Sequence, residues 1–223
     1  ATAALSTITG TGDDQVTVFG DRDFSGVTFT NIDSISLEDG IGSRQTITAT
    51  SSTSFGTTEI TRFKTGSENF TDVFDYKSAL KAGNGSVLNI ESDLGETRIT
   101  NSNKSASAIA SDSSGVVNFT TSDLEFSSGL TLGTATSAQI LSVVETLLES
   151  TNSGSNLTGS SDAMTQGGAD TDSLLVFFSQ TSGINDAVIV RYQESGDDAD
   201  FSGELSIVAI LDGVSSIDNV NIV

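Results

Sequence analysis

The sequence predicts a mainly β protein made of β-sandwich or β-roll-like sheets, with one or two short helices. Two patterns indicate this class: short stretches alternate apolar and polar residues, and they are rich in β-branched side chains, which fit a pleated surface. A third observation concerns the turns. The 223 residues include no Pro, so Gly, Asn, Asp and Ser must form the turns between the predicted strands.

Short strands fill most of the N-terminal half in this prediction. Apolar and polar residues alternate in 15–19, 27–30 and 32–37, which follow one another at about ten-residue spacing. Gly-containing segments at 20–23 and 38–40 break the pattern. β-branched composition favours further strands at 45–50, 58–63, 86–91, 97–100 and 116–120.

One short helix is predicted at 72–82, within this β-rich region. Asp72 can cap its N-terminus, because a carboxylate accepts hydrogen bonds from the free N–H groups of a first helical turn. Gly83 follows the last predicted residue, and Gly is common just after a helix because it adopts left-handed backbone angles easily.

A longer helix is predicted at 137–150. Thr136, followed three residues later by Gln139, fits a capping box, in which each side chain bonds to the backbone N–H of the other residue. The helix has one apolar face, which we expect to pack on a sheet. That face consists of Ile140, Val143, Val144, Leu147 and Leu148.

A loop and three strands are predicted after this helix. Residues 150–170 are poor in apolar side chains and are typical of a long loop. The strands follow at 173–180, 186–193 and 204–211. The first and third contain runs that are apolar on both faces, so we expect these strands to be buried in the middle of a sheet.

The length allows one or two domains, because domains hold about 50 to 250 residues. We predict a β-rich domain at 1–125, which carries a degenerate calcium-binding repeat described below, and an α+β region at 126–223. A single domain that includes both ranges is the alternative.

The charge of the chain limits its partners. Thirty acidic residues against nine basic ones give a formal net charge of −21. This charge repels nucleic acid and anionic membrane surfaces and attracts cations. The sequence has no stretch of about 18 apolar residues, so insertion into a membrane is not expected. Residues 1–5 also lack the basic and then apolar pattern of a Sec-type signal.

Enzymatic activity is not predicted. Without His or Cys the chain cannot form a Ser-His-Asp triad, a thiolate nucleophile or an ordinary zinc site. Paired carboxylates could act in glycoside hydrolysis, but they need burial to separate their pKa values. The acidic clusters are predicted to lie in turns, and the chain has no Trp to stack on a sugar.

Residues 9–17 match the calcium-binding nonapeptide G-G-x-G-x-D-x-U-x, in which U is a large apolar residue, at every specified position except the first. Gly10 and Gly12 allow a tight turn with exposed carbonyl oxygens, and Asp14 supplies an anionic oxygen. Calcium prefers this set, because it binds six to eight oxygens, several of them neutral carbonyls. An ordinary turn is the alternative.

A second candidate calcium segment begins at Asp198. Asp198, Asp200 and Ser202 occupy the oxygen-rich positions 1, 3 and 5 of an EF-hand loop, and Gly203 occupies position 6. Position 12 is Ala209, where a bidentate Glu belongs, so a complete EF-hand is not predicted. The segment could bind one calcium weakly or be a solvated hairpin loop.

The motif at 9–17, followed by 23–35, resembles segments that accompany calcium-binding repeats in RTX proteins, which bacteria export by type I secretion. Residues 58–66, which lead to 72–76, resemble the I-T-D-F-x-x-G-x-D linkers of their C-terminal regions, with Arg62 where an Asp often stands. The chain end, 218–223, is similar to their uncleaved acidic and then apolar secretion signals. The resemblance implies the C-terminal region of a surface-layer, adhesin-like or matrix protein, which folds with calcium outside the bacterial cell or on its surface.

Three functions remain open from the sequence. The first is a secreted, calcium-associated structural protein that assembles with copies of itself into a surface layer, filament or matrix, with cell-surface polysaccharide as a further partner. The second is a C-terminal export and folding module of a longer type I secreted protein. The third is a fibre subunit that polymerises by strand donation, in which 3–9 or 217–223 completes the sheet of a neighbour.

Overall fold

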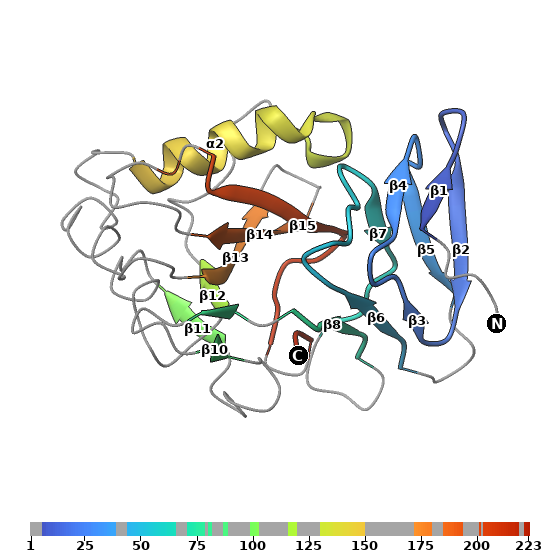
Figure 1. The fold of residues 1–223 in the computed structure, drawn as a ribbon, viewed down its shortest axis with the longest axis horizontal. Helices are drawn as coiled ribbons and strands as arrows, with labels where there is room; N and C mark the ends of the chain where they lie inside the picture. The colour runs from blue at the N-terminus through green and yellow to red at the C-terminus, as the bar shows by residue number, and fades with distance from the viewer. Residues whose placement is uncertain are drawn as a thin grey trace.

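The computed structural model describes residues 6–38, 44–65, 71–78, 80–81, 87–88, 99–102, 116–119, 130–149, 172–179, 185–193, 201, 203–218 and 221–223. These residues are mainly in strands and include one α-helix (Figure 1), which confirms the predicted fold class. Among these residues, no helix has both the length and the apolar character needed to cross a membrane.

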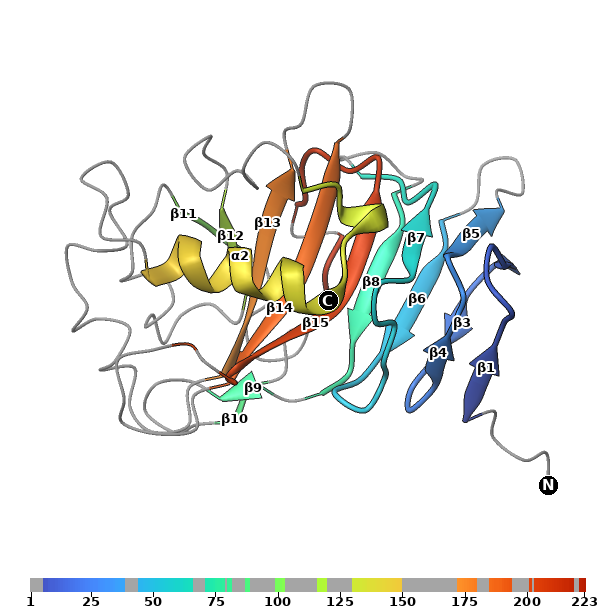
Figure 2. The same ribbon diagram turned by 90° about the horizontal axis from the view of Figure 1, so that it is seen from above.

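The N-terminal part winds as a β-helix whose successive turns pair in parallel. The first turn contains β1 (Thr7–Thr9), β2 (Gln15–Phe19) and β3 (Arg22–Asp23), and the second contains β4 (Thr28–Thr30), β5 (Ser34–Glu38) and β6 (Thr46–Ala49). The third contains a bridge at Ser54, then β7 (Glu59–Thr61) and β8 (Val73–Tyr76). The first two turns therefore add one strand to each of three stacks, and the third adds a strand to two stacks and the Ser54 bridge to the other. Figure 2 shows strands of successive turns side by side, such as β3, β6 and β8.

The length of one turn can be read from the strand register. Gln15 pairs with Ser34, 19 residues later, and Thr48 pairs with Asp75, 27 residues later. The turns differ in length because the corners hold different numbers of residues. Side chains bond across turns at these corners: the Thr58 hydroxyl donates to the Ile32 carbonyl at 2.7 Å.

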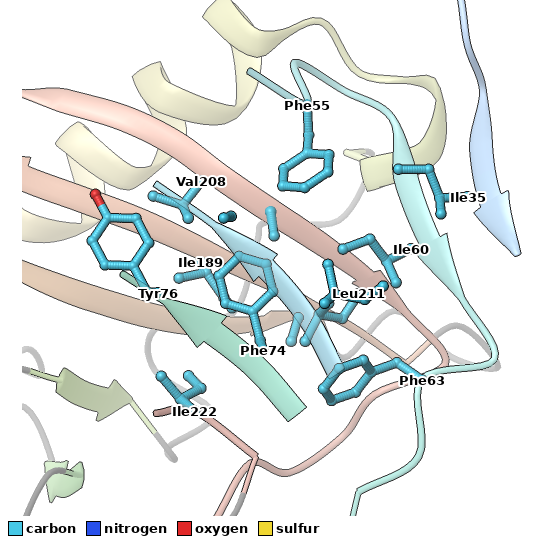
Figure 3. Close-up of a cluster of buried hydrophobic side chains, with 14 of the residues drawn as sticks. Ile35, Phe55, Ile60, Phe63, Phe74, Tyr76, Ile189, Val208, Leu211 and Ile222 are labelled. Carbon is cyan, nitrogen blue, oxygen red and sulfur yellow. The ribbon is translucent and has the colours of Figure 1, made fainter. Parts of the chain in front are cut away.

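Inward-facing side chains of adjacent turns stack in rows, which form the main core. Val16, Ile35 and Ile60 lie in register on β2, β5 and β7, and Leu211 continues the row beyond the third turn. Figure 3 shows Ile35, Ile60 and Leu211 beside the ring of Phe55 in the buried interior.

A second region closes the β-helix on the side of its third turn. β13 (Asp172–Ser179), β14 (Asp186–Gln193) and β15 (Leu205–Asp212) are antiparallel neighbours, and β15 pairs in parallel with β7. β12 (Val116–Phe119) and β11 (Ile99–Ser102) extend this sheet beyond β13, so that it has eight strands in the order β11-β12-β13-β14-β15-β7-β5-β2. β9 (Leu80–Lys81) and β10 (Val87–Leu88) form a separate pair. The eight-stranded sheet thus joins strands from both predicted ranges, 1–125 and 126–223.

The helix α2 (Ser137–Glu149) covers one face of this sheet, across β13, β14 and β15 (Figures 1 and 2). A 3-10 helix, η4 (Leu132–Thr134), precedes it. The predicted capping box is confirmed, because the Thr136 N–H donates to Gln139 Oε1 at 2.9 Å and the Gln139 N–H donates to Thr136 Oγ1 at 3.3 Å. Ile140, Val144 and Leu148 are buried in a second core between the helix and the sheet, as the apolar face predicted.

The C-terminal residues complete the third stack of the β-helix. Ile222 bridges Phe74 in parallel, the Phe74 N–H donates to the Asn221 carbonyl at 2.7 Å, and the Tyr76 N–H donates to the Val223 carbonyl at 2.8 Å. The side of β8 that faces away from β6 is therefore paired by the end of the same chain.

The predicted helix at 72–82 is wrong, because β8 and β9 lie there instead. The Asp72 carboxylate accepts hydrogen bonds from the N–H groups of Gln45 and Lys64, at 2.8 and 2.9 Å, and so joins two turns of the β-helix instead of capping a helix. All four residues of β8 are buried, and the pairing of β8 with β6 overrides the local pattern.

The other predicted strands correspond to observed ones. The strands at 15–19 and 186–193 have the predicted bounds, and strands lie within or across each of the other predicted ranges. Burial of the whole of β13 and of residues 208–211 of β15 confirms that these are central strands. β3 was missed, since it lies in a segment predicted as a break. The predicted loop at 150–170 lies outside the described residues.

Candidate functional site

The predicted calcium turn forms the corner between β1 and β2. Gly12 and Asp13 have φ angles of 105° and 55°, so the backbone reverses within a few residues. The Asp14 carboxylate closes this turn by accepting hydrogen bonds from the Thr11 N–H and, at 3.2 Å, from the Thr11 hydroxyl. One oxygen of this carboxylate, Oδ2, is therefore already a hydrogen-bond acceptor within the turn.

Gly10 allows oxygens from two adjacent turns of the β-helix to approach each other. A Cβ atom at Gly10 would lie 2.3 Å from the Asn31 carbonyl oxygen and 2.5 Å from Asp14 Oδ2, which are distances that no side chain tolerates. Asp14 belongs to the first turn and Asn31 to the second, and the Asp33 N–H donates to the Asp14 carbonyl at 2.9 Å. Calcium-binding repeats also draw ligand oxygens from neighbouring turns.

The six predicted metal ligands divide into two groups. Gly10, Gly12 and Asp14 lie together at this corner, whereas Asp198, Asp200 and Ser202 lie outside the described residues. In the part of the chain that the structure describes, no three His, Cys, Asp or Glu side chains gather closely enough to hold a metal ion. The corner offers one carboxylate and backbone carbonyls, so a cation there would depend mainly on neutral oxygens and water.

Three carboxylates lie close together where the β-helix joins the closing sheet, and their proximity was not predicted from the sequence. Asp186 on β14 lies directly opposite Asp212 on β15, and Glu59 on β7 pairs with Ile210, two residues from Asp212. Asp186 is only 2% exposed, and the Gly213 N–H donates to its Oδ1 at 3.2 Å. A Cβ at Gly133 would lie 2.5 Å from Glu59 Oε1, so η4 covers that carboxylate closely.

Burial and mutual repulsion change the acidity of this group. Burial, together with the negative charges of Asp212 and Asp186, raises the pKa of Glu59 to about 7. Burial also raises the pKa of Asp186, as does the adjacent Asp212. Acidic clusters were expected only in turns, and this cluster, whose three residues lie on strands, was not predicted.

A buried ion pair joins β13 to β14. Arg191 Nε donates to Asp172 Oδ1 at 2.8 Å, and Arg191 Nη2 donates to Asp172 Oδ2. The two side chains are 16% and 3% exposed. Because both partners are desolvated, the two parallel hydrogen bonds balance charge that would otherwise be costly to bury.

The first turn of the β-helix has open strand edges. Among the described residues, β1, β2 and β3 each stand at the end of their sheet, with a strand neighbour on one side only. Phe19, at the end of β2, is 63% exposed and is the single large apolar side chain exposed in the described ranges. β1 and β2 contain no charged residue.

The exposure of Phe19 could have been predicted from the sequence, whereas the carboxylate cluster could not. Val16 and Val18 alternate with Gln15, Thr17 and Phe19, so the strand pattern alone directs the Phe19 ring outward with the polar residues. Glu59, Asp186 and Asp212 come from three different strands, and their proximity depends on sheet register.

Comparisons with protein-family models, with curated proteins and with solved structures found no match.

Proposed function

We propose that this chain is a secreted, non-enzymatic structural protein that associates with a second copy of itself through the first turn of its β-helix, in the presence of calcium. The observation that carries the proposal is the set of open edges on β1, β2 and β3. Unpaired N–H and C=O groups along a strand edge are a template for pairing with another chain.

The composition of the edge supports this proposal. Soluble proteins usually protect an edge strand with charged side chains, above all Lys, or with Pro. β1 and β2 carry neither, although the whole chain has a net charge of −21. Phe19 adds apolar surface at the end of the edge strand β2. An edge that is uncharged and partly apolar along β1 and β2, on a strongly acidic protein, is suited to contact with an identical edge, and β3 adds one Arg and one Asp of opposite charge.

The opposite end of the β-helix limits the assembly that this contact can form. β7 is paired by β15, and β8 is bridged by Ile222. Two copies that meet through their first turns therefore make a closed, two-fold dimer, in which the same surface is used by both. A filament or surface lattice would need a second contact in addition to this one.

Calcium has two roles in the proposal. The corner at Gly10, where the Asp14 carboxylate and the Asn31 carbonyl converge, supplies oxygens from two turns. Divalent cations would also reduce the repulsion between two copies that each carry a charge of −21. The outside of a bacterial cell, which the RTX resemblance implies, provides free calcium and agrees with a structural role.

The dimer is tested by light scattering coupled to size-exclusion chromatography. Thr17→Lys and Phe19→Lys each place a charge on the open edge, and we expect both variants to be monomeric where the original chain is dimeric. Thr30→Lys is the matched control, because Thr30 is also exposed but lies on β4, between β1 and the third turn. A monomeric original chain at every concentration, with calcium present, would exclude the proposal.

The calcium role has its own control pair. Asp14→Asn removes the carboxylate at the corner, whereas Asp13→Asn makes the same charge change one residue away, at a left-handed position that Asn tolerates. We expect calcium to raise the melting temperature of the original chain and of Asp13→Asn, and to raise that of Asp14→Asn less. An equal calcium effect on both variants would remove the corner from the proposal.

A second function uses the same edge. As the export and folding module of a longer secreted protein, the chain would pair β1, β2 and β3 with a preceding turn of the same polypeptide. In a longer chain with such a turn, Thr17→Lys would lower the melting temperature and leave the oligomeric state unchanged. Strand donation by 217–223 is less favoured, because residues 221–223 already pair with β8 within one chain.

A further inference from the structure

A pocket of about 220 Å³ opens between a corner of the β-helix and the closing sheet. The corner before the third turn supplies Thr50, Ser51 and Ser54, β8 supplies Tyr76, and the sheet supplies Arg191 from β14 and Ser206 from β15. The pocket shares no residue with the Asp14 corner, the Glu59 cluster or the open strand edge, so it is a separate feature of the molecule.

The Tyr76 hydroxyl is an unsatisfied group in the wall of this pocket. Tyr76 is 3% exposed, and its hydroxyl oxygen has no hydrogen-bond partner among the described residues. The nearby Ser78 hydroxyl donates to Ser51 Oγ at 3.0 Å and accepts from the Ser51 N–H at 2.7 Å, so its proton is not available to the Tyr76 oxygen. In Figure 3 the hydroxyl of Tyr76 points away from the apolar cluster. A buried hydroxyl without a partner costs stability, so a ligand that satisfies it gains affinity.

Two other hydroxyls of the wall are also free for a ligand. The hydroxyls of Ser54 and Ser206 make no hydrogen bond to described residues, and both side chains are exposed. They come from opposite walls, one from the β-helix and one from β15. A ligand between them could bond to both at once, since each hydroxyl can donate one hydrogen bond and accept two.

The charge of the pocket favours a neutral ligand. Arg191 already uses Nε and Nη2 to bind Asp172, so the pair adds no net charge to the wall. The chain as a whole carries −21 and repels anions at long range. Ile207 and Val208 add an apolar surface beside the hydroxyls. Hydroxyl groups around an apolar patch match a sugar ring, which has hydroxyls at its rim and C–H groups on its face.

We propose that this pocket binds one neutral sugar residue, as part of a glycan, with the Tyr76 hydroxyl as its buried hydrogen-bond partner. The volume supports a single ring, because pockets for larger ligands measure about 300 to 1,000 Å³. This binding is independent of the proposed dimer, whose contact surface lies on the first turn. It would give a structural protein at a cell surface a means of attachment to polysaccharide.

The proposal is tested by saturation-transfer NMR with D-glucose, D-galactose and N-acetyl-D-glucosamine, and with D-glucuronate as the anionic comparison. We expect at least one neutral sugar to bind, with a Kd on the order of 1 mM for a ligand of this size, and glucuronate to bind more weakly than the neutral sugars. Absence of transfer to every neutral sugar, or tighter binding of glucuronate, would overturn the proposal.

Two variants and a control locate the binding. Tyr76→Phe removes only the buried hydroxyl, and Ser206→Ala removes an exposed hydroxyl from the opposite wall; each should weaken binding about fivefold or more, as expected for one lost hydrogen bond. Thr30→Val removes a surface hydroxyl on β4 and should leave binding unchanged. Unchanged affinity in the double variant Tyr76→Phe, Ser206→Ala would show that the sugar binds elsewhere and would reject this pocket.

Discussion

Phe29 on the second turn of the β-helix stacks on Phe55 of the third turn, with ring centroids 5.2 Å apart and ring planes inclined by 21°. Phe24 meets both rings edge-on, at 5.2 and 6.2 Å, and Phe74 lies 6.4 Å from Phe55. The rings come from all three turns, so this cluster ties the turns together in the direction of the β-helix axis. Aromatic pairs in these geometries add stability beyond the area they bury.

Phe55→Ala should therefore be among the most destabilising single changes in the chain. Phe55 is 1% exposed, and truncation of a buried Phe costs about 3–5 kcal/mol of unfolding free energy because a cavity remains. Phe19→Ala is the control, since Phe19 is exposed and a surface change alters stability by about 0.5 kcal/mol or less. Urea unfolding of both variants in monomeric conditions measures the difference, and similar losses in the two would contradict the role of the cluster.

Gly10→Ala should destabilise the first turn by overlap of atoms. The added methyl group would lie 2.3 Å from the backbone oxygen of Asn31, which cannot move without breaking the pairing of β1 with β4. Thr9→Ala, one residue earlier and exposed, should have little effect. We expect faster hydrogen exchange of the β1 and β2 amides in Gly10→Ala only. Equal exchange rates in both variants would mean that the corner accommodates the methyl group without loss of stability.

Glu59 should make the protein less stable as pH rises through neutrality. Its pKa is about 7 in the folded chain and about 4.5 in the unfolded chain, so between these values the folded state binds more protons than the unfolded state. The stabilisation from the protonated carboxyl is complete below about pH 4.5 and is lost as pH rises to about 7. Asp186 acts in the same direction, since its pKa is also raised.

The variant Glu59→Gln isolates this effect, because Gln resembles the protonated side chain at every pH. Its unfolding free energy should match that of the original chain near pH 4.5 and exceed it increasingly up to pH 7, in urea titrations with a chelator present. Glu38→Gln is the control, with a partly exposed carboxylate on β5. A constant difference between Glu59→Gln and the original chain across this range would refute the assignment.

The two ion pairs Asp172–Arg191 and Glu38–Arg62 should differ strongly in their effect on stability. Removal of one partner from a buried pair leaves an uncompensated charge, so Asp172→Asn should cost about 3–5 kcal/mol. Arg62 and Glu38 are 58% and 35% exposed, and Glu38→Gln should cost about 1 kcal/mol or less. Chemical denaturation at low and high salt measures both, and a salt-sensitive loss in Asp172→Asn would mean that this pair is solvated.

Features that depend on neighbouring residues could be predicted from the sequence. The capping box of Thr136 and Gln139 uses groups three residues apart, and both of its hydrogen bonds are present. Strands such as 15–19 and 186–193 were predicted with the observed bounds because the alternation of side chains is itself a local property. The RTX resemblance, calcium binding and secretion remain predictions.

The sequence by itself determined the mainly β class, the helix at Ser137–Glu149 and the tight turn at Gly10–Asp14, because these depend on hydrogen bonds and side-chain periodicity within a few residues. Only the tertiary structure decided that Val73–Tyr76 is a strand, that successive turns pair in parallel, and that Glu59, Asp186 and Asp212 lie together at one partly buried site. The physical reason is that strand pairing and the loss of water around a carboxylate depend on partners that lie tens to more than a hundred residues away in the chain.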